Sequence, residues 1–141
     1  MVGGIAMVTM INYRVHFFDT DAMAVVHHAN YIRWFEIARV DFLRKAGIIL
    51  TEMMDDGYVF PITDVRVKYL SSGYYDDILT IKTIPTALTR AKMEFSYEVY
   101  REKDNTLLVK GFTQNVFTNK NTGKIVRLPA KYYDKMRQAL K

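Results

Sequence analysis

The side chains best suited to chemistry gather in residues 17–31, which contain Asp19, Asp21, His27 and His28. This segment leads into a stretch with helical periodicity, and the free N–H groups at the start of a helix form a positive end. Such an end suits a developing oxyanion and keeps a nearby carboxylate ionised, as a nucleophile or a general base requires. Aspartate also caps turns in such loops, so a structural role stays open for both aspartates.

The histidines raise a second possibility, a metal site shared with the aspartates. Adjacent histidines such as His27 and His28 usually point in different directions, and the sequence offers no second cluster of ligands. The chain has no cysteine, which excludes disulfides, thiolate nucleophiles and cysteine-based zinc sites. We therefore predict no metal site and no cofactor.

A strand and a long helix are predicted to position this segment. Residues 11–17 alternate between apolar and polar side chains, which predicts a half-buried strand with His16 on its solvated face. Helical periodicity runs from Asn30 to Ala46, and Gly47 ends it. The apolar face of this helix is broad, which indicates a helix wrapped by other structure. It comprises Tyr31, Trp34, Phe35, Ala38, Phe42 and Ala46, flanked by Ile32 and Leu43.

The rest of the chain is predicted to be mainly β-structure. A tight hairpin turn is expected at Asp104 and Asn105. A short helix is expected up to Asp56, with Thr51 as its N-cap. Alternating or β-rich runs cover residues 64–69, 78–84, 92–99 and 107–118, and a C-terminal helix is expected from Pro129 to Lys141.

These elements predict the fold class. An antiparallel sheet with one apolar face and a single apolar helix can bury both by curling the sheet around the helix. The fold class is therefore α+β, a hot-dog fold with a curved antiparallel β-sheet wrapped around a long central α-helix. We expect a single domain over residues 1–141, because a chain of this length builds one core.

The segment at residues 17–31 resembles a known signature. Its D-x-D loop leads through V-V to an H-x-N-Y helix start, which is similar to the 4-hydroxybenzoyl-CoA thioesterase-like family of hot-dog enzymes. The similarity continues in residues 34–36, 38–39 and 75–81. The resemblance implies an acyl-CoA thioesterase.

The resemblance also implies roles for particular residues. Asp21 would act as nucleophile or general base, while Asp19 stays structural. Backbone N–H groups near His28 would polarise the thioester carbonyl, and the His28 side chain would lie near the pocket. Asn30 and Tyr31, at the helix start, would contact the substrate.

The nucleotide end of CoA, in this family, lies over the hairpin between the third and fourth strands. The matching residues are Thr89, Arg90 and Lys92, with Lys120, Lys124 and Arg127 as weaker additions. The net charge of +5 agrees with an anionic partner. The family also implies a homodimer or homotetramer, because the fold completes its sites across subunits.

The chain departs from the family pattern at two positions. It has His27 where an aromatic residue is usual and Ala24 where a glycine is common. If that glycine has a positive φ, Ala24 strains the loop, because a Cβ disfavours such backbone angles.

Several alternatives bear on the function. Another branch of hot-dog thioesterases places a catalytic glutamate on the central helix, where this chain has Glu36, although its neighbours Arg33 and Arg39 favour a surface ion pair. A non-catalytic protein that binds acyl-CoA or an acyl carrier is the non-enzymatic alternative. The sequence lacks a G-x-S-x-G motif of serine hydrolases and a D-x-N-P-x-H pattern of hot-dog hydratases.

The surroundings of the protein can also be predicted. Basic and aromatic residues do not interleave on one surface, so no nucleic-acid partner is expected. No apolar run is long enough to span a bilayer, and residues 1–10 lack the basic region of a signal peptide. We expect a cytoplasmic protein without a membrane partner.

Overall fold

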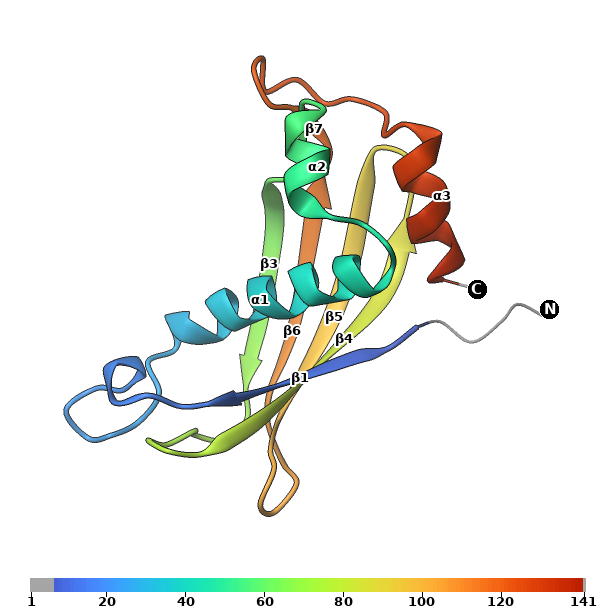
Figure 1. The fold of residues 1–141 in the computed structure, drawn as a ribbon. Helices are drawn as coiled ribbons and strands as arrows, with labels where there is room; N and C mark the ends of the chain where they lie inside the picture. The colour runs from blue at the N-terminus through green and yellow to red at the C-terminus, as the bar shows by residue number, and fades with distance from the viewer. Residues whose placement is uncertain (1–6, 141) are drawn as a thin grey trace.

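A curved antiparallel sheet and one long helix dominate the computed structural model, which describes residues 7–140 (Figure 1). The sheet has five strands in the order β1-β4-β5-β6-β3, and all neighbouring pairs are antiparallel. The strands are β1 (Thr9–Arg14), β3 (Ile62–Tyr69), β4 (Ile78–Leu88), β5 (Lys92–Arg101) and β6 (Thr106–Val116). β2 (Tyr58–Val59) and β7 (Thr118–Asn119) form a separate short pair.

Helix α1 (Ala29–Lys45) lies across the inner face of the sheet (Figure 1). Its buried face carries Phe35, which stacks on Tyr97 of β5 with ring centroids 4.4 Å apart. Gly111 of β6 lies under the same ring, and a Cβ at this position would clash with Phe35. The helix therefore packs closely on the sheet, because glycine stands where the contact is tightest. The predicted α+β hot-dog fold is confirmed.

Two shorter helices pack at the end of the sheet where α1 finishes (Figure 1). They are α2 (Leu50–Asp55) and α3 (Ala130–Gln138). The expected start of α2 is wrong, since Ile49 is its N-cap and Thr51 lies inside the helix. The expected C-terminal helix begins as predicted after Pro129, but it ends at Gln138, and Lys141 lies outside the described residues.

The predicted strand over residues 11–17 is wrong at its C-terminal end. β1 ends at Arg14, and Phe17 begins a short 3-10 helix, η1 (Phe17–Asp19), with 70% of its surface exposed. The Asp19 carboxylate turns the chain at this point, because its Oδ2 accepts a hydrogen bond from the His16 N–H at 2.9 Å. A side-chain contact thus overrides the alternating pattern.

Candidate active site

The buried aspartate of the loop, Asp19, ties β1 to the start of α1. Its Oδ2 accepts hydrogen bonds from the Tyr13 hydroxyl at 2.8 Å and from the His16 N–H. Its backbone oxygen accepts the Asn30 side-chain amide at 2.7 Å and the His27 N–H at 2.9 Å. Asp19 is therefore a structural anchor, and Asn30, which the sequence placed in contact with substrate, holds the loop against the helix.

The exposed aspartate, Asp21, both caps a turn and presents a free carboxylate oxygen. Its Oδ1 accepts the Met23 N–H at 2.8 Å and the Val25 N–H at 3.2 Å. Backbone bonds from Asp21 N to Val25 O and from Ala24 N to Asp21 O close the same loop. Within residues 7–140, Asp21 Oδ2 has no hydrogen-bond partner. The capping role therefore leaves one oxygen available for chemistry.

The loop is strained at Ala24, the position where the family that this chain resembles commonly has a glycine. Ala24 has φ of 60°, in the left-handed region. Its carbonyl accepts the Tyr75 N–H at 3.0 Å, so the conformation is held by the neighbouring β3–β4 connection. A Cβ in this region costs about 1–2 kcal/mol.

Ala24→Gly is expected to stabilise the fold by about 0.5–1 kcal/mol, because relief of the Cβ strain exceeds the entropy that glycine adds to the unfolded chain. This corresponds to a rise in Tm of about 1–4 °C for a chain of this size, measurable by calorimetry. Ala22→Gly, in the same loop but without a positive φ, is the matched control and should lower the Tm. A lower Tm for Ala24→Gly would contradict the strain.

The start of α1 offers one free backbone donor. The N–H groups of His27, Ala29 and Asn30 are bonded to Asp19 O, His27 Nδ1 and His27 O, respectively. His28, the N-cap residue, donates its N–H to no acceptor in the part of the chain that the structure describes. An unused donor at the positive end of a helix is suited to bind a carbonyl oxygen that gains negative charge.

A small pocket of about 180 Å³ lies beside this donor. Its lining residues are Val25, Val26, His28, Tyr31, Tyr69, Leu70, Ser71 and Ser72. Burial raises the pKa of Tyr31 to about 12, so its phenol is neutral at physiological pH. His28 and Tyr31, two of the residues that the resemblance assigned to the site, thus line the same pocket.

Tyr69 is the residue of this pocket that sequence reasoning missed. It is the last residue of β3, its hydroxyl donates to the His28 carbonyl at 3.0 Å, and its ring stacks on the imidazole with centroids 4.3 Å apart. The one available signal was its place on the apolar face of an alternating strand. That signal could not show which residue it would contact.

The residues expected to bind the nucleotide lie elsewhere in the same chain. The β4–β5 turn lies beside α3, at the opposite end of α1 from the Asp21 loop (Figure 1). Thr89 caps this turn by accepting the N–H groups of Ala91 and Lys92, both at 3.1 Å. The Arg90 Nε donates to Leu128 O at 3.0 Å, and Lys92 pairs with Glu94 at 3.6 Å. One chain therefore does not bring these residues to Asp21 and His28.

Among the described residues, Glu36 does not form the surface ion pair with Arg33 or Arg39 that its neighbours in the sequence suggested. It is exposed on α1, and the structure gives it no ion pair with Arg33 or Arg39 within residues 7–140. Arg39 instead points into the core, where it is 2% exposed and donates to the Tyr97 hydroxyl at 3.2 Å. The expected surface pair with Arg39 is therefore wrong, because that side chain belongs to the buried face of the helix.

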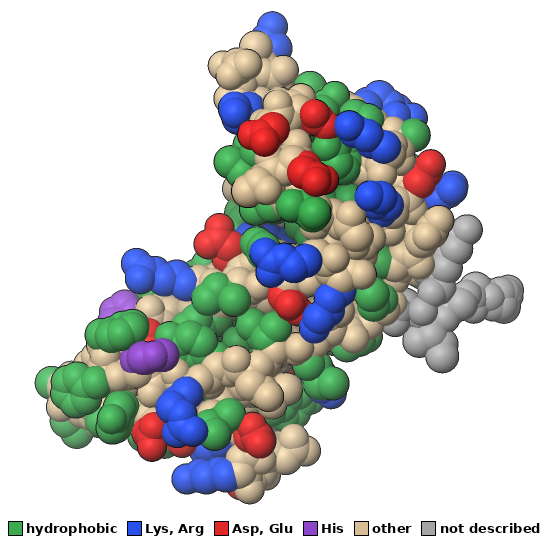
Figure 2. All heavy atoms as spheres, in the orientation of Figure 1, with side chains coloured by type: hydrophobic (Ala, Val, Ile, Leu, Met, Phe, Trp, Pro, Cys, Tyr) green, Lys and Arg blue, Asp and Glu red, His purple; other side chains and the backbone are tan. Residues whose placement is uncertain are grey.

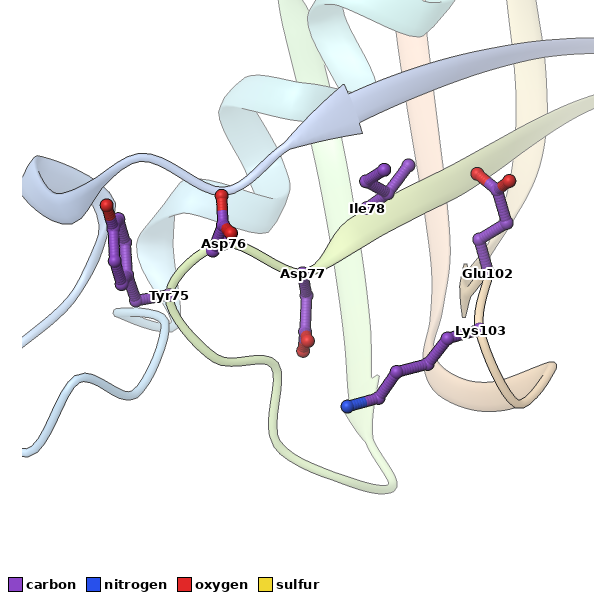
Figure 3. Close-up of a pocket in the computed structure, with 6 residues that line it drawn as sticks. All are labelled: Tyr75, Asp76, Asp77, Ile78, Glu102 and Lys103. Carbon is purple, nitrogen blue, oxygen red and sulfur yellow. The ribbon is translucent and has the colours of Figure 1, made fainter.

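A second hollow, of about 470 Å³, lies where the β3–β4 connection meets the β5–β6 turn (Figure 3). Figure 3 shows the Asp76 and Asp77 side chains pointing in opposite directions. Asp76 pairs with Arg14 at 3.0 Å, and Asp77 pairs with Arg101 at 3.6 Å. No group of three His, Cys, Asp or Glu residues in the described chain could hold a metal ion.

The loop around Asp21 also exposes apolar side chains. Figure 2 shows hydrophobic side chains gathered at this end of the molecule, with histidines among them. The residues concerned are Phe17, Phe18, Met23, Tyr74 and Tyr75, with exposures from 47% to 79%. We call this set the apolar tip. Contiguous apolar surface of this kind marks interaction sites.

The comparison with known proteins agrees with this geometry. The Thioesterase-like superfamily matches residues 15–140, and the chain belongs to it. The predicted hot-dog thioesterase is thereby confirmed as to family and enzyme class.

Within the part of the chain that the structure describes, no helix is long and apolar enough to cross a membrane.

Three relatives illustrate the match. An acyl-CoA thioester hydrolase, YbgC of Escherichia coli O6:H1, is 33% identical over 95 residues, which cover 67% of this chain and 70% of the relative. The DHNA-CoA thioesterase structure from Staphylococcus aureus has a TM-score of 0.87 at 30% identity and covers 94% of this chain and 88% of that one. The 4-hydroxybenzoyl CoA thioesterase of Pseudomonas sp. strain CBS-3 shares the fold, with a TM-score of 0.82 at 24% identity, covering 92% and 99%.

Proposed function

We propose that this chain is an acyl-CoA thioesterase in which Asp21 either attacks the thioester carbonyl or activates a water molecule. The His28 N–H stabilises the oxyanion that forms. The observation that carries the proposal is the free His28 N–H at the start of α1, next to a loop that presents a free Asp21 oxygen. The E. coli and S. aureus relatives, which are named for the hydrolysis of CoA thioesters, support the substrate class.

Two routes are consistent with this arrangement. As a nucleophile, the Asp21 carboxylate adds to the thioester carbonyl, CoA leaves as the thiolate, and water hydrolyses the resulting anhydride. As a general base, Asp21 takes a proton from water while the hydroxide adds to the carbonyl carbon, and the departing thiolate then takes up a proton. In both routes the carbonyl oxygen gains negative charge that the His28 N–H binds.

The test of this function is a hydrolysis screen over acyl-CoAs of different chain length and aromaticity, with released thiol as the readout. We expect turnover of at least some substrates without added metal and in the presence of a chelator. If no substrate is turned over although acyl-CoA binds, the non-catalytic binding protein is the better description. Activity that a chelator abolishes and zinc restores would contradict the carboxylate mechanism.

We also propose that the protein is at least a dimer, in which a second copy brings its β4–β5 turn, with Arg90 and Lys92, towards Asp21 of the first. β1 and β3 are the two edges of the sheet, and free edges expose unpaired backbone groups. The apolar tip adds apolar surface beside Asp21 that a second copy could cover. Sedimentation at micromolar concentration should show a dimer or tetramer, and a stable active monomer would contradict the proposal.

The proposed nucleotide contact predicts the kinetics of Arg90→Ala and Lys92→Ala. Phosphate contacts far from the thioester bind the ground state and the transition state equally, so their loss should raise KM and leave kcat unchanged. A rise of about 3- to 10-fold is expected for each variant. Lys103→Ala, on the β5–β6 turn, is the control for lost surface charge. A fall in kcat at constant KM would show that the nucleotide does not bind at Arg90 and Lys92.

A further inference from the structure

We propose that Tyr69 is a positioning residue that holds His28, and with it the start of α1, in the orientation that thioester hydrolysis needs. The inference rests on the proposed function, because it concerns the same N–H donor. It adds a residue from β3, a strand that carries no other part of the proposed machinery.

Two contacts join Tyr69 to His28. The Tyr69 hydroxyl donates to the His28 carbonyl at 3.0 Å, and the phenol ring stacks on the imidazole at 4.3 Å between centroids with 24° between the planes. At the start of the helix, the same carbonyl also receives the Tyr31 N–H at 3.4 Å. Tyr69 therefore adds a hydrogen bond from β3 and contacts both the backbone and the side chain of one residue.

The other side of the donor is held from within the helix. The His28 N–H shares a peptide plane with the His27 carbonyl, and that carbonyl accepts the Asn30 N–H at 3.0 Å. In a trans peptide the N–H and the C=O point in opposite directions. The His28 N–H consequently points away from the helix. The Asn30 N–H orients the peptide group before His28 by bonding the His27 carbonyl, and the Tyr69 hydroxyl orients the peptide group after it by bonding the His28 carbonyl.

The surroundings of Tyr69 limit its freedom to move. Its ring meets the Tyr31 ring edge-on at 5.8 Å, and Tyr31 is 2% exposed. Gly73 closes the other side of Tyr31, since a Cβ there would lie 2.9 Å from the Tyr31 hydroxyl. Tyr69 itself is 40% exposed at the edge of the 180 Å³ pocket. Tyr69 thus packs against Tyr31 and also lines the pocket.

The experiment compares Tyr69→Phe, Tyr69→Leu and Tyr100→Phe in the full chain. Tyr69→Phe removes only the hydroxyl, and Tyr69→Leu removes the stacking as well. Tyr100→Phe is the matched control, because it removes a hydroxyl that bonds Glu98 at 3.2 Å on another strand. The measurements are kcat and KM for an acyl-CoA that the parent hydrolyses, the Tm, and the imidazole proton resonances of His28.

We expect Tyr69→Phe to lower kcat about 3- to 10-fold, and Tyr69→Leu about 100-fold, at nearly constant KM. The control should keep the parental kcat. The His28 resonances should show the ring-current shift of a stacked aromatic ring in the parent and in Tyr69→Phe, and lose it in Tyr69→Leu.

Other results would overturn the inference. Parental kcat in Tyr69→Leu with a lower Tm would leave Tyr69 with a structural role alone. If the His28 resonances of the parent lack the ring-current shift, the two rings are not stacked and the inference fails. A parent without turnover would overturn this inference together with the proposed function, whereas turnover that survives Tyr69→Leu but not Asp21→Asn would overturn this inference alone.

Discussion

Asp21→Asn is expected to lower kcat by about 10²- to 10⁴-fold, and by more if Asp21 is the nucleophile. The asparagine oxygen can still accept the N–H groups of Met23 and Val25, which Asp21 Oδ1 accepts at 2.8 and 3.2 Å. The turn is therefore kept while the negative charge and the basic oxygen are lost. Initial rates under substrate saturation measure the effect, and the Tm should change little.

Glu36→Gln is the matched control for Asp21→Asn, because it neutralises the competing carboxylate on α1. Glu36 is exposed and makes no ion pair in the described residues, so the change should leave kcat close to that of the parent. Both variants must bind a non-hydrolysable acyl-CoA analogue. Near-normal kcat in Asp21→Asn with a loss in Glu36→Gln would favour the helix-glutamate branch.

His28→Pro is expected to lower kcat by about 10²- to 10³-fold, because proline removes the one N–H that the proposed oxyanion site uses. His28 has φ of −53°, which proline can adopt, and the N-cap position makes no intrahelical N–H bond that proline would break. The variant thus deletes a donor without requiring the helix to break. Circular dichroism and the Tm establish that α1 is intact.

His28→Ala separates the backbone donor from the imidazole. It keeps the N–H and removes the ring that stacks on Tyr69. We expect a loss of kcat within about 10-fold, much smaller than in His28→Pro. Equal losses in the two variants would assign the effect to the imidazole and contradict the backbone oxyanion site.

Local sequence was sufficient to predict several elements. The helix expected from Asn30 to Ala46 is α1 at Ala29–Lys45, because an apolar period and a terminal glycine both act over one or two turns. The hairpin turn at Asn105 is present with φ of 55°, since asparagine adopts this conformation readily. Predicted boundaries failed at Phe17, at Thr51 and at the C-terminal end of α3. At Phe17 the hydrogen bond from the His16 N–H to Asp19 turns the chain.

The candidate site was predictable only in part. The order of Asp21, His28, Asn30 and Tyr31 along one short segment, together with the family resemblance, indicated the start of a helix as the place of chemistry. The roles of individual side chains depend on partners that the segment does not contain. Asn30 serves the Asp19 carbonyl, and Asp21 keeps one oxygen free while the other caps its turn.

The sequence by itself determined the fold class, the long central helix and the segment that carries the candidate chemistry, because each depends on residues a few positions apart. The tertiary structure alone decided that the Tyr69 hydroxyl bonds the His28 carbonyl and that Arg39 is buried in the core. It also places the β4–β5 turn, which carries Arg90, at the opposite end of α1 from the Asp21 loop. These relations join residues distant in sequence. They depend on strand register and on the packing of α1 against the sheet, which no local pattern encodes.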